Sequence, residues 1–403
     1  MDSESPRVTL DRRAIMHLFA RARGALPARW NEALFHLPAD VTDDTPALCR
    51  ARGWSLEDLG PREERLPALV PGTHEGAIER LRASLTGLDR DVRVFAAVVP
   101  EGRVLARACS AIAPGGIVLA DVSPHATVPL RHHRALTSSV IAAPPVRLRG
   151  RSALVGAIGH RNFYHWMFDA IPRVALVRDA KLDDVERWIA PATDLPVAAE
   201  LLARAGVPAS RIHGMRRSDH VVCDELVVTS APGEVCEPTA RTVESLRAML
   251  LGARGAEAPA RGDRRVYIAR RGRRRVANEA ELAPVLARHG VETVAMEGLS
   301  LDEQIARVRG ASCVIAPHGA ALAHIIHAAR GATLVELLAP RYFNPSFFVL
   351  AGACGMRYGA IEGLRLARDW RDPSTADFRV DADALGRMLA TVFAQADGAV
   401  LMD

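Results

Sequence analysis

Short apolar runs alternate with amphipathic helical segments along most of the chain. In the carboxyl half, this pattern predicts strands over 265–269, 291–295, 312–316 and 332–338, with helices over 278–289, 300–310 and 318–329 between them. Asn278 and Ser300 each stand three positions before a glutamate, as the first residue of a capping box does. Strands and helices that alternate at this spacing predict a parallel sheet covered on both faces.

The amino half has a less regular start. Short β-like runs separated by glycine and proline cover 92–98 and 117–120. A strand over 153–158, a long apolar helix over 162–179 and further alternating strands and helices up to 229 follow. The Gly/Ala/Pro-rich segment 251–262 is typical of a linker. We therefore expect an α/β protein of two facing Rossmann-like domains, over 91–235 and 236–385, with an N-terminal extension or cap over 1–90 and a tail over 386–403. In open α/β sheets ligands bind at the carboxyl ends of the strands, so the cleft between the two domains is the expected site.

Composition agrees with an ordinary globular protein of more than one core. The 403 residues are 49% hydrophobic and 25% charged, and the net charge is only +5. The positive charge is carried almost wholly by arginine, since Lys181 is the only lysine. This bias is a weak argument for a polyanion partner, so we expect no nucleic-acid binding.

The six cysteines are scattered without C-x-x-C pairs or zinc-ligand spacing, which favours reduced thiols over a disulfide framework. The first residues show no continuous hydrophobic segment typical of a signal peptide, and no window has about 18 uncharged apolar residues. We expect a cytoplasmic protein, with peripheral association at the inner face of the membrane left open.

The segment 160–169 concentrates histidine, aromatic residues and aspartate. His165 and Asp169 are four positions apart, so they share one face of a predicted helix. Asp169 could orient His165 as a general base, or accept a proton itself. The alternative is an internal pair that anchors the helix, with Asn162 as its cap and the aromatic residues in the core.

A second candidate site lies where the predicted strand 312–316 breaks on Pro-His-Gly-Ala and a helix begins. Small residues at such a turn allow close approach of a ligand, and free backbone N–H groups there favour phosphate, so we expect His318, Gly319 and Ala320 to contact one. Arg270, at the end of another strand, could grip the same phosphate, whereas the arginines that follow it are more typical of a solvated loop. Glu336 is either an acceptor for ribose hydroxyls or an ordinary carboxylate at a strand end.

These motifs together resemble family 61 glycosyltransferases. The sequence N-F-Y-H-W-M-F-D over 162–169, followed by P-R at 172–173, is similar to the family's N-Y-Y-H-W-L-F-D-x-x-P-R signature. The segments V-Y-I-A-R over 266–270, R-V-A-N-E over 275–279, L-S-L-D-E-Q-I over 299–305, P-H-G-A-A-L over 317–322 and V-E-L over 335–337 follow in the family's order. The chain departs from the pattern at His324 and His327, where the family has Asn and Phe.

The resemblance implies a GT-B fold and an inverting transfer from a nucleotide-sugar, usually a UDP-sugar, to a saccharide hydroxyl. It implies a role in capsular or exopolysaccharide assembly, with a lipid-linked acceptor as one option. Arg275, Asn278 and Leu322 join the expected donor site, and Asn162, Tyr164 and Trp166 the expected acceptor site. No metal or cofactor is expected, because side chains and a helix end can neutralise the leaving diphosphate. The competing hypothesis is a non-catalytic nucleotide- or polysaccharide-binding protein of the same fold.

Overall fold

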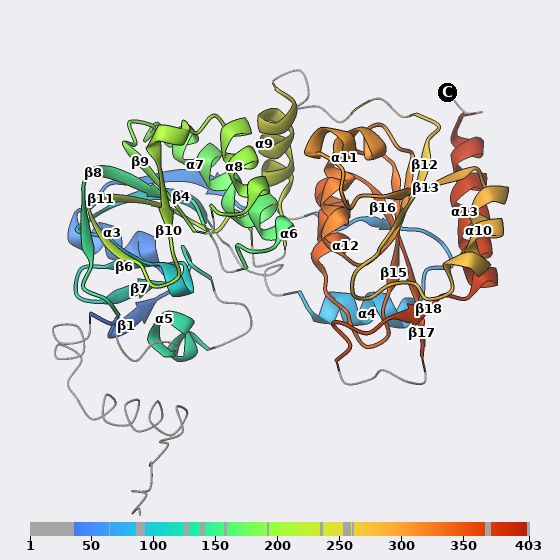
Figure 1. The fold of residues 1–403 in the computed structure, drawn as a ribbon, viewed down its shortest axis with the longest axis horizontal. Helices are drawn as coiled ribbons and strands as arrows, with labels where there is room; N and C mark the ends of the chain where they lie inside the picture. Colours follow the sequence, from blue (N-terminus) through green and yellow to red (C-terminus); the bar gives the residue numbers. More distant parts are fainter. Residues whose placement is uncertain are drawn as a thin grey trace, which may run out of the picture.

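The computed structural model describes residues 36–63, 65–85, 93–124, 129–137, 142–156, 159–191, 193–233, 237–252, 259, 262–366 and 372–400. Residues 1–35 of the expected extension, most of the expected linker and residues 401–403 of the expected tail lie outside these ranges. Two large sheets with helices around them account for most of the described chain (Figure 1). The prediction of an α/β fold is confirmed.

The larger sheet has ten strands in the order β1-β7-β6-β5-β11-β8-β9-β10, with β4 paired to both β11 and β2. Its strands β11, β8, β9 and β10 are parallel, as the alternating pattern predicts, whereas β4, β5, β6 and β7 form antiparallel pairs. The strands are β1 (Asp40–Thr42), β2 (Leu56–Pro61), β4 (Arg93–Pro100), β5 (Arg103–Leu105), β6 (Ser110–Ala113), β7 (Ile117–Leu119), β8 (Val146–Leu154), β9 (Arg187–Pro191), β10 (Ile212–Met215) and β11 (His220–Thr229).

The second sheet has six parallel strands in the order β13-β12-β14-β15-β16-β3. Parallel strands need coverage on both faces, and every residue of β14 and β15 is buried. The strands are β12 (Arg265–Ala269), β13 (Val291–Ala295), β14 (Cys313–Pro317), β15 (Thr333–Leu338), β16 (Arg357–Glu362) and β3 (Ala68–Leu69), and a separate hairpin pairs β17 (Leu364–Arg365) with β18 (Phe378–Arg379).

The helices connect and cover these sheets (Figure 1). The α-helices are α3 (Thr45–Arg52), α4 (Glu75–Ala83), α5 (Arg134–Thr137), α6 (Phe163–His165), α7 (Pro172–Asp179), α8 (Pro196–Arg204), α9 (Ala240–Leu251), α10 (Glu279–Arg288), α11 (Leu301–Val308), α12 (Ser346–Ala353) and α13 (Ala382–Val400). The 3₁₀ helices are η1 (Ala106–Ala108), η2 (Leu130–His132), η4 (Ala209–Arg211) and η6 (Ala320–His327), and η3 (Trp166–Ala170) is a π-helix.

Two predicted helices differ in type from the expectation. The apolar segment 162–179 consists of α6, the π-helix η3 and α7 in succession, and Pro172 begins the last piece. Proline lacks a backbone N–H, so the regular hydrogen-bond ladder cannot run through it unchanged. The helix expected after Pro317 is the 3₁₀ helix η6, which begins with a bond from Leu322 N–H to the carbonyl of Gly319.

The residues expected as an N-terminal extension are shared between the two sheets. Strands β1 and β2 join the larger sheet, whereas β3 extends the edge of the second sheet and α4 contacts β16. One hydrophobic cluster also includes side chains from elements around both sheets, among them Trp166 of η3 and Phe348 of α12. The division into an extension, two domains and a tail stays a prediction.

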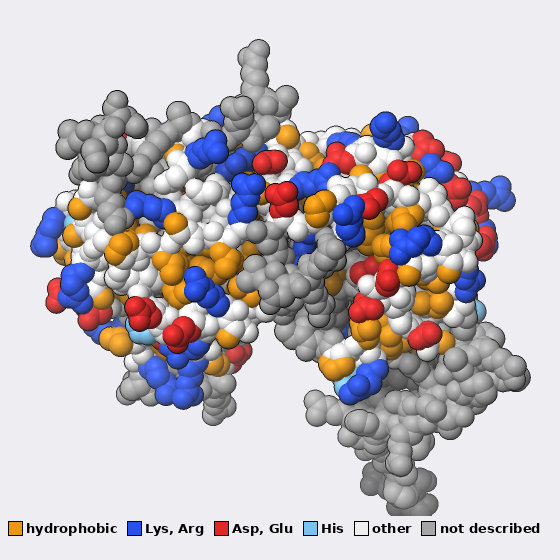
Figure 2. Space-filling view, turned by 180° about the vertical axis from the view of Figure 1, so that it is seen from behind, with side chains coloured by type: hydrophobic (Ala, Val, Ile, Leu, Met, Phe, Trp, Pro, Cys, Tyr) orange, Lys and Arg blue, Asp and Glu red, His pale blue; other side chains and the backbone are white. Residues whose placement is uncertain are grey.

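Charge is spread over the surface. On the face that Figure 2 shows, blue arginines and red carboxylates are interspersed over both halves of the described chain. Mixed signs of this kind are typical of an ordinary solvated surface rather than of a polyanion-binding stripe. Among the described helices, none is both long and apolar enough to cross a membrane.

Candidate functional site

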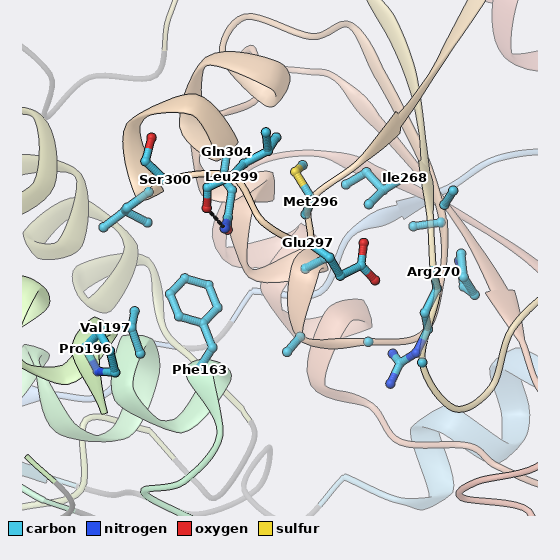
Figure 3. A pocket seen from close by; sticks show the side chains of 18 of the residues that line it. Phe163, Pro196, Val197, Ile268, Arg270, Met296, Glu297, Leu299, Ser300 and Gln304 are labelled. Carbon is cyan, nitrogen blue, oxygen red and sulfur yellow. Dashed lines mark hydrogen bonds between the residues drawn. The ribbon is translucent and has the colours of Figure 1, made fainter. Parts of the chain in front are cut away.

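A cavity of about 530 Å³ opens at the carboxyl ends of β12, β13 and β14. Arg270, Glu297 and Pro317 line it from the ends of these strands, and Phe163 of α6 and Val197 of α8 line the opposite wall (Figure 3). Small-molecule sites typically occupy about 300–1,000 Å³ and lie beyond the carboxyl ends of parallel strands. The cavity therefore has the place and size of a ligand site.

Arg270 lies on the cavity wall, as its position after β12 predicts. Its Nη1 donates a hydrogen bond to the carbonyl oxygen of His318 over 2.7 Å. Gly319 and Ala320 line the cavity beside it, and a Cβ added at Gly319 would overlap the guanidinium. Burial lowers the pKa of Arg270, and the neighbouring positive charge of Arg274 lowers it further.

Arg274 brings a second guanidinium into this region, although the sequence favoured a solvated loop for it. Its Cζ lies 4.5 Å from the centre of the Tyr342 ring, in cation–π geometry. Within the described residues, Nε and Nη1 of Arg274 and Nε of Arg270 are buried and donate to no acceptor. Buried donors without acceptors are costly, so an anion that reached these groups would be stabilised.

His318, Glu336 and Tyr358 form a buried hydrogen-bonded chain behind the cavity wall. His318 Nδ1 lies 2.6 Å from Glu336 Oε1, and the Tyr358 hydroxyl donates to Glu336 Oε2 over 2.6 Å. Burial lowers the pKa of His318, an effect that nearby Glu336 opposes, and burial raises the pKa of Tyr358. We conclude that a neutral His318 donates its Nδ1–H to Glu336, which fixes the carbonyl of His318 under Arg270.

This chain limits the roles expected for two candidates. Glu336 has no exposed surface, and both of its oxygens already accept hydrogen bonds, so in this structure it offers nothing to a ribose. His318 is 6% exposed and packs edge-on against the Tyr342 and Phe347 rings. Neither residue lines the cavity, whereas Gly319 and Ala320 do.

His165 and Asp169 form the pair that their spacing predicts. His165 Nδ1 lies 2.6 Å from Asp169 Oδ2, and their side chains are 19% and 16% exposed. Since a carboxylate accepts from Nδ1–H, Nε2 is left as the basic nitrogen of the ring. Neither residue lines the cavity, but their neighbour Phe163 does.

Two further residues fix the position of this pair. A Cβ on Gly159 would lie 2.7 Å from His165 Nε2, so glycine leaves room for the imidazole, and its φ of +87° suits glycine as well. Arg173 is 1% exposed and donates to the carbonyl oxygens of Asp169, Thr229 and Val122. Arg173 thereby ties the π-helix that carries Asp169 to the end of β11.

Three of the expected donor residues make contacts within the protein, and their donor role stays a prediction. Arg275 is exposed and forms an ion pair with Asp377, 2.8 Å apart. The amide of Asn278 bridges Glu281 and the backbone of Val380. Leu322 is fully buried in the hydrophobic core, and none of the three lines the cavity.

The expected acceptor residues also make contacts within the protein, and none of them lines the cavity. Asn162 is exposed and caps α6, where its side chain accepts from Tyr164 N–H over 3.0 Å. Tyr164 is 5% exposed and packs edge-on against Phe347. Trp166 is fully buried, and its Nε1 donates to the carbonyl of His160. The acceptor role of these residues stays a prediction.

The cavity also contains residues to which the sequence gave no ligand-binding role. Glu297 follows β13 without any recognisable motif, whereas Ser300 and Gln304 lie inside the L-S-L-D-E-Q-I segment and had a detectable signal there. Gln304 donates to the carbonyl of Leu299 over 2.9 Å and accepts from Nε2 of buried His324 over 2.8 Å. The ring of His324 stacks on Phe163, with 5.2 Å between the ring centres.

No group of three or more His, Cys, Asp and Glu side chains suited to a metal ion occurs within the described ranges. The expectation of metal-independent chemistry stays a prediction, because the described residues leave it untested.

The parallel sheet and the cavity at its carboxyl edge define an α/β protein with a cavity at the place where Rossmann-like folds bind small molecules. A family model, Glycosyltransferase 61, matches residues 163–335, which run from α6 to β15 and make up less than half of the chain. This match confirms the resemblance to family 61 and supports glycosyltransferase activity, which requires a sugar donor and an acceptor. No curated protein matched the chain.

Proposed function

We propose that the protein is an inverting glycosyltransferase that moves a sugar from a nucleotide-sugar, with UDP as the nucleotide, to a hydroxyl group of a saccharide acceptor. The observation that carries this proposal is the family match, because its span holds both the His165–Asp169 pair and the cavity wall with Arg270. We place the reaction in the cytoplasm, in the assembly of surface polysaccharide, with the growing saccharide on a lipid carrier as one form of the acceptor.

The chemistry follows from the two groups of residues. His165 Nε2 takes the proton of the acceptor hydroxyl while Asp169 holds Nδ1–H, and the hydroxyl oxygen attacks the anomeric carbon of the donor. The bond between that carbon and the phosphate oxygen breaks, and the nucleoside diphosphate leaves with the electron pair. Arg270, with the neighbouring positive charge of Arg274, stabilises the negative charge that grows on the phosphate.

The first test is a thermal-shift panel of UDP-, GDP- and CMP-sugars on the purified protein. We expect stabilisation by UDP-sugars alone. Indifference to every nucleotide-sugar would contradict the proposal and favour a non-catalytic polysaccharide-binding protein.

The second test separates chemistry from binding. His165→Ala should bind UDP with nearly unchanged affinity but lose transfer by about 10²- to 10⁴-fold, the usual contribution of a general base. Asp169→Asn should also lower transfer while leaving UDP binding intact, because an amide oxygen is a weaker partner for the imidazolium. His132→Ala, an exposed histidine of η2, is the control. Normal transfer by both variants would show that the base lies elsewhere.

A further inference from the structure

Glu297 places a carboxylate inside a cavity that we assign to an anionic ligand. It lies two residues beyond β13, is exposed, and lines the cavity between Met296 and Arg270 (Figure 3). A negative charge at this position repels a phosphate, so it lowers donor affinity unless it makes a compensating contact. The charge of Glu297 also acts on neighbouring Arg270, whose pKa it raises against the effect of burial. Among the groups of a ligand, a neutral hydroxyl donor is the one that gains from a carboxylate there.

Only one oxygen of the Glu297 carboxylate accepts a hydrogen bond from the described part of the chain. Its Oε1 accepts a hydrogen bond from the backbone N–H of Arg271 over 3.0 Å, which ties it to the loop after β12. Within the described part of the chain, Oε2 accepts no hydrogen bond from any residue. Glu297 is therefore held in place by one oxygen while the other is free for a ligand.

The position in the sheet indicates which hydroxyl is bound. Strands β12 and β13 are parallel neighbours joined by α10, with Ala269 opposite Ala295, so Arg270 and Glu297 follow at the same edge. In βαβ units that bind nucleotides, phosphate lies near the first strand end and an acidic residue near the end of the second strand binds the ribose. Arg270 and Glu297 repeat this arrangement.

The other carboxylates near the cavity do not compete for this role. Glu336, the candidate from the sequence, is fully buried, and its two oxygens accept from His318 and Tyr358. Glu200 lies on the opposite wall, on α8, away from the ends of β12 and β13, and its charge is paired with that of Arg204, with 2.8 Å between Oε1 and Nη2.

We propose that Glu297 accepts hydrogen bonds from the 2′- and 3′-hydroxyls of the donor's ribose. The protein is then selective for ribonucleotide donors over donors that carry a deoxyribose. This assignment rests on the proposed function, since it names the part of the donor that one wall of the same cavity recognises.

The test compares the dissociation constants of UDP and 2′,3′-dideoxy-UDP by calorimetry. A hydrogen bond to a charged group changes affinity by about 10- to 100-fold, so we expect the wild-type protein to prefer UDP by that factor. Glu297→Gln should reduce the preference to about threefold or less, with the loss confined to UDP, because an amide retains only a weaker acceptor. Glu200→Gln, on the opposite wall, should keep the full preference.

Equal affinity of the wild-type protein for both nucleotides would overturn the ribose assignment, and so would a preference that survives Glu297→Gln. Both outcomes leave nucleotide binding intact, and with it the proposed function. Failure of the wild-type protein to bind UDP, GDP or CMP would instead remove the proposed function and this assignment together. The melting temperature of Glu297→Gln, an exposed position, checks that the variant is folded.

Discussion

Gly319→Ala is the smallest change that should displace Arg270 from the cavity wall. The added methyl group would overlap Nη1 of Arg270 and lie 2.9 Å from its Cζ, so the guanidinium must leave the carbonyl of His318. The backbone itself accepts alanine, because Gly319 has an extended φ of 177°. The substitution therefore acts on the position of one side chain.

The expected magnitudes differ between stability and binding. Loss of the hydrogen bond to His318 lowers the unfolding free energy by about 1.5–3 kcal/mol. Alanine also reduces the conformational entropy of the unfolded chain, which raises the unfolding free energy by about 0.4–1 kcal/mol. Unfolding free energy should thus fall by about 0.5–2.6 kcal/mol. If Arg270 contacts the diphosphate, its displacement should weaken UDP binding by about 2–3 kcal/mol, or about 30- to 150-fold.

Calorimetry with UDP on four proteins tests this reasoning: wild type, Gly319→Ala, Arg270→Gln and the double variant. Both single changes remove the same contact, so the double variant should bind no more weakly than Arg270→Gln alone. Gly272→Ala is the matched control, because Gly272 lines the same cavity and a Cβ there meets nothing within 4 Å. Wild-type affinity in Gly319→Ala, or full additivity in the double variant, would refute the proposed contact.

Two further predictions concern buried groups. Burial lowers the pKa of His324 to about 4, so the folded state binds fewer protons than the unfolded state below pH 6.5, and stability should fall from pH 6.5 towards 4 by up to about 3 kcal/mol from this residue. His324→Asn should reduce that slope in melting experiments across this range, and an unchanged slope would contradict the assignment. Glu336→Leu leaves the buried donors of His318 and Tyr358 without an acceptor and should lower the unfolding free energy by about 2–5 kcal/mol in urea. Glu292→Leu at an exposed site is its control, and equal losses in the two variants would exclude this explanation.

Local patterns predicted much of the second sheet. The strands β12, β13, β14 and β15 begin and end within a residue or so of their expected bounds, because apolar runs between helical segments mark buried parallel strands. Ser300 and Glu303 form the expected capping box, and His165 and Asp169 the expected pair. Each of these features depends on residues at most a few positions apart.

Features that depend on tertiary contacts were not predictable in this way. The sequence places Glu336 near the end of a strand but does not show how deeply its side chain is buried. Burial decides whether this carboxylate contacts a ligand or a buried histidine. Arg275 pairs with Asp377, about a hundred positions away, and this contact has no local signal in the sequence. Glu297 was missed for a related reason, because only the pairing of β12 with β13 brings it beside Arg270.

Two histidine–carboxylate pairs of the same hydrogen-bond length remain as possible bases, and their surroundings distinguish them. The side chain of His318 is only 7% exposed, and this burial lowers its pKa, to which the charges of neighbouring Arg274 and Arg270 add. In an inverting displacement the base and the leaving group lie on opposite sides of the anomeric carbon. Phe163, two positions before His165 on α6, lines the wall across the cavity from Arg270, whereas His318 is in direct contact with Arg270 and would lie on the leaving-group side. On the proposed mechanism, His165 therefore takes the proton, and the His318–Glu336 pair serves to hold the carbonyl that anchors Arg270.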